Sequence, residues 1–291
     1  MNNLKHKDVL NQVEDWDIVI ESKTSLFDLK LKEVWRYRDL LWLLIRRDFV
    51  AFYKQTVFGP IWFFIQPIFT TITFVFVFGK LAGISTDGLP QPLFYLAGIT
   101  GWSYFSECFL KTSTVLRDNA NIFGKVYFPR IIMPLSIVFS NLVKFSVQFS
   151  LLVLMILYYY FQGYHFQFTF YIFALPLLIL TMATQGLAFG MIISALTTKY
   201  RDLALLLAFG IQLLMYATPI AYPLSSLSGT TKAVVQLNPV TYIIEGFRKS
   251  LLGIGDFDLI KLLYIIVISI LFLLIGLVVF NKVEKDFVDT I

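Results

Sequence analysis

The stretch YKQTVFGPIW (residues 53–62) separates two parts of the chain that differ sharply in composition. The residues before it are mostly polar, whereas those after it are apolar in blocks of about 20 residues, the length that crosses a bilayer. Gly59 and Pro60 mark a turn at the boundary, and Trp62 stands where an interfacial aromatic side chain is expected. We therefore expect the first membrane span to begin here.

Composition predicts an all-α polytopic membrane protein. Of the 291 residues, 57% are hydrophobic and 15% are charged, whereas a soluble domain has about 25% charged residues. The mean hydropathy is +0.73, and helices can satisfy all their backbone hydrogen bonds in lipid. One cysteine and two histidines exclude a disulfide framework and disfavour a Cys/His metal site, so we expect no metal ligands.

The chain divides into four predicted regions. Residues 1–32 form a cytosolic extension, residues 33–56 an amphipathic helix, residues 57–280 a six-span transmembrane domain and residues 281–291 a cytosolic tail. The six predicted spans are 57–78, 93–110, one within 131–160, 170–196, 203–222 and 259–280. In the fourth span, Gly186 and Gly190 form a small-residue pair that permits close helix contact.

The segment 225–258, between the last two predicted spans, is too apolar for a plain loop and too short for a span. A helix signal begins at Asn238 and Pro239, and Glu245 and Arg248 follow. We expect one or two short re-entrant helices there, dipping part-way into the outer leaflet.

The distribution of lysine and arginine predicts the orientation. With six spans both termini share one side, and that side has eighteen of the 24 cationic residues, whereas the opposite side has four. Cationic residues concentrate on the cytosolic side of membrane proteins, so both termini are expected in the cytosol. This bias also accounts for the net charge of +5, which therefore does not indicate nucleic-acid binding.

The helix predicted at 33–56 is amphipathic. Apolar side chains recur at helical spacing at Leu41, Ile45, Phe49 and Phe52. The opposite side includes Arg36, Arg46, Arg47 and Lys54. This pattern is typical of a helix in the membrane surface, and we favour that interpretation because the segment runs directly into a span. The alternative is a solvated cytosolic helix packed on its own domain.

The cytosolic loop TSTVLRDNANIFGKVYF (residues 112–128) contains a second amphipathic pattern. Val115, Leu116, Ile122 and Phe123 lie among polar residues and predict a short helix that ends near Gly124. Such a helix can dock into a groove of another protein. It can equally lie on the membrane surface, and composition does not separate the two.

Few ionisable residues fall within the predicted spans. Lys144 lies between Asn141 and Gln148 on one helix face, and Glu107 lies near the cytosolic end of the second span. This polar face marks either a pathway or subunit interface, or local hydrogen bonding between helices. No phosphate-binding loop, HExxH motif or pair of intramembrane carboxylates occurs, so we expect no catalytic residues and no ATP binding by this chain.

Several motifs occur together in a fixed order from about residue 46 to 280. They are YKQTVFGPIW at 53–62, VYFPR at 126–130 with PLS at 134–136, SAL at 194–196 with KYRD at 199–202, PI at 219–220, LNP at 237–239 and IEGFR at 244–248. The set resembles the ABC-2 type permeases that export bacterial surface polysaccharides, namely O-antigen, teichoic acid and capsule.

The resemblance implies a homodimer in the bacterial inner (plasma) membrane, associated with two copies of an ABC ATPase subunit. ATP and Mg would bind that ATPase, so this chain would be a permease without cofactor and without enzymatic activity. A lipid-linked glycan would move from the cytosolic to the outer side through a channel at the dimer axis, with membrane lipids around it and no nucleic-acid partner.

The resemblance also implies roles for particular residues. The loop that contacts the ATPase would contain Val115, Leu116, Arg117, Asn119, Ile122 and Phe123. The cytosolic gate, where the substrate would arrive, would contain Arg46, Arg47, Tyr53, Lys54, Gly59 and Pro60. The outer gate would contain Asn238, Pro239, Glu245 and Arg248.

The chain is rich in aromatic residues, at 17%. Sugar rings pack their C–H faces on aromatic side chains, so aromatic residues of the first and fifth spans are candidates to line a glycan channel. These candidates are Phe63, Phe74, Phe78, Phe209 and Tyr216. The alternative for each of them is core packing or contact with lipid.

Three other functions stay open from the sequence. An ABC-2 exporter of a drug or small lipid would share the architecture, but we expect it to lack the 53–62 motif. A membrane-embedded glycosyl or acyl transferase needs convergent His, Asp or Glu residues near the interface, and no plausible set occurs. A channel would need a filter-like motif, and none is present.

Overall fold

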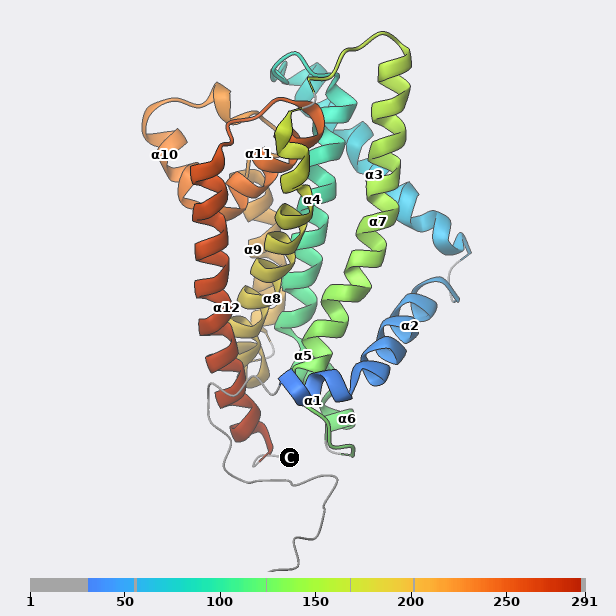
Figure 1. The fold of residues 1–291 in the computed structure, drawn as a ribbon, viewed down its shortest axis with the longest axis vertical. Helices are drawn as coiled ribbons and strands as arrows, with labels where there is room; N and C mark the ends of the chain where they lie inside the picture. The colour runs from blue at the N-terminus through green and yellow to red at the C-terminus, as the bar shows by residue number, and fades with distance from the viewer. Residues whose placement is uncertain (1–30, 55–56, 124, 168, 201, 289–291) are drawn as a thin grey trace, which may run out of the picture.

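The computed structural model describes residues 31–54, 57–123, 125–167, 169–200 and 202–288. Their regular structure is entirely helical (Figure 1). The elements are α1 (Leu31–Arg36), α2 (Arg38–Lys54), η1 (Gly59–Ile61), α3 (Trp62–Phe74), η2 (Val75–Leu81), α4 (Gln91–Ser113), α5 (Val115–Asp118), α6 (Ala120–Phe123), α7 (Ile132–Phe161), η3 (Phe170–Ala174), α8 (Leu175–Lys199), α9 (Leu203–Ala217), η4 (Leu224–Ser226), α10 (Gly229–Leu237), α11 (Pro239–Leu252) and α12 (Leu259–Val288). The predicted extension 1–32 falls outside the described residues except for its last two positions.

Within the residues that the structure describes, four helical segments are long and apolar enough to cross a membrane. They are Trp62–Leu81, Ile132–Phe161, Phe170–Lys199 and Leu259–Val283, and they coincide with four of the six predicted spans. The protein is therefore a multi-pass membrane protein. The other two predicted spans are also helices, but α9 has 15 residues and α4 is less apolar.

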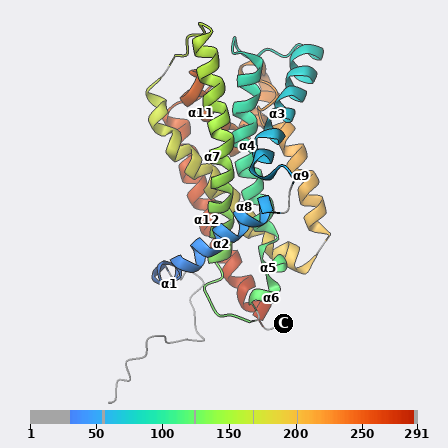
Figure 2. The ribbon, with the colours of Figure 1, turned by 90° about the vertical axis from the view of Figure 1, so that its right-hand side faces the viewer.

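Helix α4 occupies the centre of the bundle, between α7 and α8 (Figures 1 and 2). It also packs against α3, α9 and α11, and most of its side chains are buried. Because protein surrounds it on most sides, α4 can include glycine, serine, threonine and tyrosine residues that a lipid-facing helix would not favour. Its lower hydropathy thus follows from its central position.

The predicted contact at Gly186 and Gly190 is confirmed. A Cβ atom at Gly186 would lie 2.7 Å from Cβ of Cys108 and 2.9 Å from the carbonyl oxygen of Phe105. A Cβ at Gly190 would overlap Thr112 in the same way. The missing side chains therefore let α8 approach α4 closely.

The two ends of the bundle differ. Helices α1 and α6 and the end of α12 lie at one end, whereas α10 and α11 lie at the other (Figures 1 and 2). Two short helices therefore follow α9, as expected for segment 225–258. The first predicted span also contains an unexpected feature, because α3 continues into a π-helix, η2, in place of a regular α-helical end.

Candidate functional site

Helix α2, the predicted gate helix, packs on the bundle through its apolar side. Leu44 and Ile45 are buried, and α2 lies against α7. The predicted apolar face thus covers another helix of the same chain. Trp35 of α1 and Trp42 of α2 are 71% and 68% exposed, and Leu43 of α2 is 61% exposed, so these side chains can reach a membrane interface.

The predicted gate residues surround the junction between α2 and α3. Arg46, Arg47 and Lys54 are exposed, and Arg47 Nη2 lies 2.9 Å from Asp48 Oδ1. Gly59 adopts a left-handed φ of 52°, a conformation that glycine favours, and it begins the turn η1. Tyr53 belongs to the last turn of α2 and Pro60 to η1, but their side chains fall outside the described part of the structure.

A charge cluster joins α4 to α7 near this junction. Lys144 Nζ lies 2.7 Å from Glu107 Oε2, and Lys111 Nζ lies 3.6 Å from the same oxygen. Lys111 also donates a hydrogen bond to Asn141 Oδ1 over 3.3 Å. The polar face predicted around Lys144 therefore makes interhelical hydrogen bonds, the second of the two interpretations. The sequence did not reveal that Glu107 pairs with Lys144, because that contact depends on which helices are neighbours.

The cluster also approaches the junction itself. The Lys144 ammonium lies 5.8 Å from the ring centre of Phe63, which stacks on Phe49 of α2 at 6.1 Å. Ser140 of α7 donates to Asp48 Oδ2 over 3.5 Å. Helices α2, α3, α4 and α7 are thus connected at one place by ionic and aromatic contacts.

The predicted ATPase-contact loop forms two short helices, α5 and α6, in place of the single helix expected. Val115, Leu116 and Phe123 are buried, and α5 packs on α8. These three apolar side chains therefore stabilise the bundle and are not available for another protein's groove. The two helices are separated at Asn119, whose side-chain Nδ2 donates to the carbonyl oxygen of Val115 over 2.9 Å.

Other residues of the loop are partly or fully exposed. Arg117 is ion-paired with Asp118 at 2.9 Å, and Ile122 is partly buried. Val126 and Tyr127 are 58% and 53% exposed. The accessible surface of the loop thus consists largely of residues that the amphipathic pattern did not select.

The four predicted outer-gate residues lie together, but two of them are buried. Glu245 and Arg248 are 3% and 1% exposed, and Arg248 Nη1 lies 3.3 Å from Glu245 Oε1. The guanidinium donates to the carbonyl oxygens of Pro219 over 2.5 Å and Ile220 over 2.9 Å. Its Cζ atom lies 3.7 Å from the ring centre of Phe94. Arg248 therefore ties the end of α9 to α11 and α4.

Asn238 makes a second tie at the same place. It is the N-cap of α11, since Oδ1 accepts from the backbone N–H of Val240 over 3.1 Å. Its Nδ2 donates to Thr218 Oγ1 over 2.9 Å. Pro239 occupies the first position of α11, where its missing N–H costs nothing.

The loop after α11 is closed by ionic contacts. Glu245 Oε2 accepts from the backbone N–H of Asp256 over 2.9 Å. The Asp256 carboxylate pairs with Lys261 and lies 3.6 Å from Lys232. The hydrogen bond from Lys261 holds the pKa of Asp256 below its ordinary value.

The five predicted channel-lining aromatics do not share one surface. Phe63 and Phe74 are buried within the subunit. Phe209 and Tyr216 are 60% and 47% exposed on α9, and the ring centres of Phe78 and Tyr216 are 6.5 Å apart. Core packing, the stated alternative, therefore describes Phe63 and Phe74, whereas the other three residues lie at or near an open surface.

These features define a class of protein: a multi-pass helical membrane protein with charged helix junctions at both ends of its bundle. The family description "ABC-2 type transporter" matches residues 39–252. The chain belongs to this family, which confirms the resemblance drawn from the motifs.

Named relatives cover almost the whole chain. The O-antigen export system permease protein RfbA of Myxococcus xanthus is 25% identical over 265 residues, which are 90% of this chain and 98% of that protein. A protein of the same name from Klebsiella pneumoniae is 25% identical over 252 residues, 86% of this chain and 94% of its own length.

Proposed function

We propose that this chain is the permease subunit of an ATP-driven exporter that moves a lipid-linked polysaccharide out of the cell. The observation that carries the proposal is similarity along nearly the full length of both chains to O-antigen export permeases. ATP hydrolysis would belong to a separate ATPase subunit. A drug or small-lipid exporter of the same family is the alternative.

In this proposal α4 and α9 also cross the membrane, as the second and the fifth of six spans in chain order. The 23 residues of α4 correspond to about 34 Å at 1.5 Å per residue, enough for a hydrocarbon core of about 30 Å. The 15 residues of α9 correspond to only about 22 Å. The residues after Ala217 would complete this crossing. They are held in place by hydrogen bonds from Asn238 to Thr218 and from Arg248 to the carbonyls of Pro219 and Ile220.

The cytosolic side would be the end of the bundle that contains α1, α5 and α6. Arg36, Arg117 and Lys125 belong to this end, and the excess of lysine and arginine around it supports the orientation. Both termini would then be cytosolic in the inner membrane.

The exposed side of α9 is the proposed contact between two copies of the chain. Of its residues only Ile211 is buried, while Leu205, Phe209 and Leu213 are 77%, 60% and 52% exposed. A symmetric dimer would cover this face and bring the α9 aromatics towards the shared axis.

Cysteine cross-linking tests the dimer contact. Cys108 is buried, so a Cys108→Ala background is suitable. We expect Phe209→Cys to cross-link between copies in membranes, whereas Ile270→Cys, 52% exposed on α12, does not. Equal cross-linking at both positions would contradict the α9 contact.

The burial of Val115, Leu116 and Phe123 changes the proposed ATPase contact. We propose that the outward residues of the loop, Lys125 and Tyr127, touch the ATPase, and that the buried residues hold the loop in place. Replacement of Tyr127 by Ala is expected to weaken ATPase stimulation at unchanged stability, whereas Phe123→Ala lowers stability as well.

Reconstitution with the ATPase subunit tests the function directly. We expect a lipid-linked glycan to stimulate ATP hydrolysis, and Arg46→Ala with Arg47→Ala to reduce glycan export while assembly is retained. Stimulation by small amphiphiles and none by lipid-linked glycans would favour the drug-exporter alternative. Loss of assembly in the double variant would make the junction structural.

A further inference from the structure

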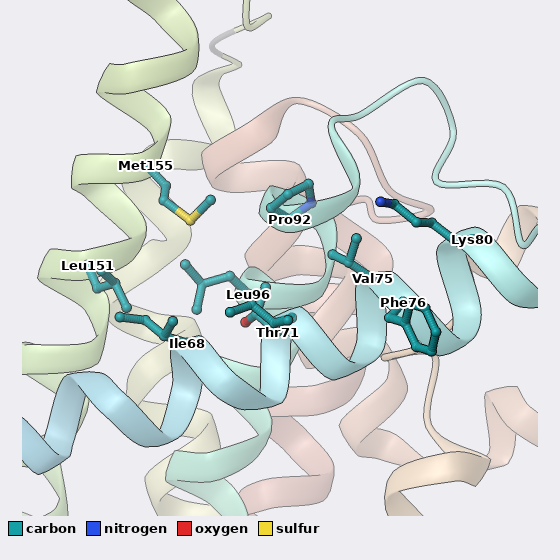
Figure 3. A pocket seen from close by; sticks show the side chains of 10 residues that line it. Ile68, Thr71, Val75, Phe76, Lys80, Pro92, Leu96, Leu151 and Met155 are labelled. Carbon is teal, nitrogen blue, oxygen red and sulfur yellow. The ribbon is translucent and has the colours of Figure 1, made fainter.

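An apolar groove of 390 Å³ lies between α3 with η2, α4 and α7 (Figure 3). Its lining is almost entirely apolar and includes Ile68, Leu96, Leu151 and Met155. The volume is in the range of about 300–1,000 Å³ that is typical of small-molecule sites. None of the predicted gate, loop or channel residues lines it.

A cation stands at one end of the groove. Lys80 is exposed at the end of η2, and Figure 3 shows its side chain extending back over the groove towards Pro92. Within the described part of the chain no carboxylate lies within ion-pair distance of its ammonium group. An apolar groove that ends at a lysine without a carboxylate partner is complementary to an amphiphile with an anionic head group.

A buried hydroxyl group in the groove also lacks a partner. Thr71 is 6% exposed, and its Oγ1 makes no hydrogen bond with any residue that the structure describes. Threonine on a helix commonly bonds to a carbonyl of the preceding turn, as Thr70 does to Gln66 over 2.9 Å. A buried polar group without a partner calls for an explanation, and a bound ligand with an oxygen acceptor supplies one.

The backbone is irregular at this place as well. The groove is lined by Val75, Phe76 and Lys80 of the π-helix η2. Single π-helical turns are rare and occur frequently at functional sites. Here the π-helix η2 contributes the three residues that form the wall of the groove at the end where Lys80 lies.

We propose that this groove binds one anionic glycerophospholipid from the surrounding leaflet. Its phosphate pairs with Lys80, Thr71 donates to an ester carbonyl oxygen, and an acyl chain lies along Ile68, Leu151 and Met155. The assignment to the outer leaflet rests on the proposed orientation of the permease, because Lys80 lies at the end opposite to α5 and α6. The surrounding bilayer supplies this ligand at high concentration.

Native mass spectrometry of the purified full-length chain tests the site, with phosphatidylglycerol and phosphatidylcholine of identical acyl chains as probes. We expect one phosphatidylglycerol to be retained in preference to phosphatidylcholine. Lys80→Gln is expected to weaken its binding about fivefold, the effect of one lysine near an anionic head. Lys125→Gln, which removes an exposed lysine from the other end of the bundle, leaves it unchanged.

Two further pairs of variants separate binding from folding. Thr71→Val is expected to lower lipid affinity but to raise the thermal midpoint of the lipid-free protein, because it removes the unpaired hydroxyl. A purely packing role would move both quantities in one direction. Ile68→Trp fills the groove and is expected to prevent binding, whereas Phe69→Trp, beside it but outside the groove, is not.

Equal retention of the two lipids, or equal effects of Lys80→Gln and Lys125→Gln, would overturn the proposal. A photoreactive phosphatidylglycerol should label residues 68–80 or 151–155, and labelling confined to other segments would also overturn it. The lipid-binding measurement does not require glycan transport. If phosphatidylglycerol is not retained but glycans still stimulate the ATPase, only the lipid site is refuted. If phosphatidylglycerol is retained but glycans do not stimulate the ATPase, only the proposed function is refuted.

Discussion

Replacing Arg248 by Met tests the buried hydrogen bonds and ion pair at the C-terminal end of α9. The substitution keeps an unbranched side chain but removes the donors to the carbonyls of Pro219 and Ile220 and leaves Glu245 buried at 3% exposure without its cation. Removing one member of a buried ion pair costs about 3–5 kcal/mol. We expect the free energy of unfolding to fall by that amount.

The measurement is an unfolding titration of the detergent-purified permease in SDS, with Arg117→Met as the matched control. Arg117 forms an ion pair with Asp118 at the surface, for which a loss of at most about 1 kcal/mol is expected. Adding Glu245→Gln to Arg248→Met removes the stranded charge and is expected to restore about half of the loss. Similar losses for Arg248→Met and Arg117→Met, or no recovery in the double variant, would refute the assignment.

Three further predictions concern other contacts. Gly190→Leu is expected to separate α8 from α4 and to cost about 1–3 kcal/mol or more of the free energy of unfolding, whereas Gly210→Leu, which meets open space within the subunit, has little effect on the unfolding of the single subunit. Lys144→Met removes the nearer of the two lysines that pair with Glu107 and is expected to cost about 1–3 kcal/mol in the same titration, with partial recovery when Glu107→Gln is added. Asp256→Asn is expected to lower the thermal midpoint at pH 7. Because the folded-state pKa of Asp256 is depressed, its ion pair stabilises the protein above the ordinary aspartate pKa of about 4, and the difference from wild type disappears as the pH falls through the folded-state pKa.

Each of these has an outcome that contradicts it. Equal effects of leucine at Gly190 and Gly210 would mean that α8 and α4 are not in close contact. A Lys144→Met variant as stable as the wild type would mean that the ion pair between Lys144 of α7 and Glu107 of α4 contributes little to stability. A difference between Asp256→Asn and wild type that persists unchanged to low pH would place its cause outside the titration of Asp256.

The positions of the helices were predictable because apolar blocks of bilayer length leave little choice of structure. Each of the six predicted spans contains a helix, although α9 ends at Ala217, before the predicted end of the fifth span at 222, and the short helices α10 and α11 follow α9 as expected. The sequence did not predict that α4 would be less apolar than the other long helices. Its polar residues are tolerated because neighbouring helices shield them, and the sequence does not show which helices are neighbours. No residue pattern in the sequence indicated the π-helix at the end of α3.

The functional faces were harder to predict than the helices. Periodicity shows that Val115 and Leu116 share an apolar face, but it does not identify what covers that face, and α8 of the same chain does. Likewise, spacing brought Lys144 and Asn141 together on α7, but only the packing of α7 on α4 places Glu107 beside Lys144. Phe63 and Phe74 face the core for the same reason: residue type does not distinguish a channel wall from a packed interior.

The double use of Asn238 restricts which residues the chain can accept there. Its Oδ1 accepts from Val240 and its Nδ2 donates to Thr218 Oγ1, whose own hydroxyl proton is already donated to the carbonyl of Leu214 over 2.8 Å. An aspartate would cap α11 equally well, yet it would turn a carboxylate oxygen towards an oxygen that has no proton left to give. A serine would reach only the cap. Asparagine therefore meets both chemical demands at once, and a change to either of its usual substitutes at helix caps would separate the start of α11 from the end of α9.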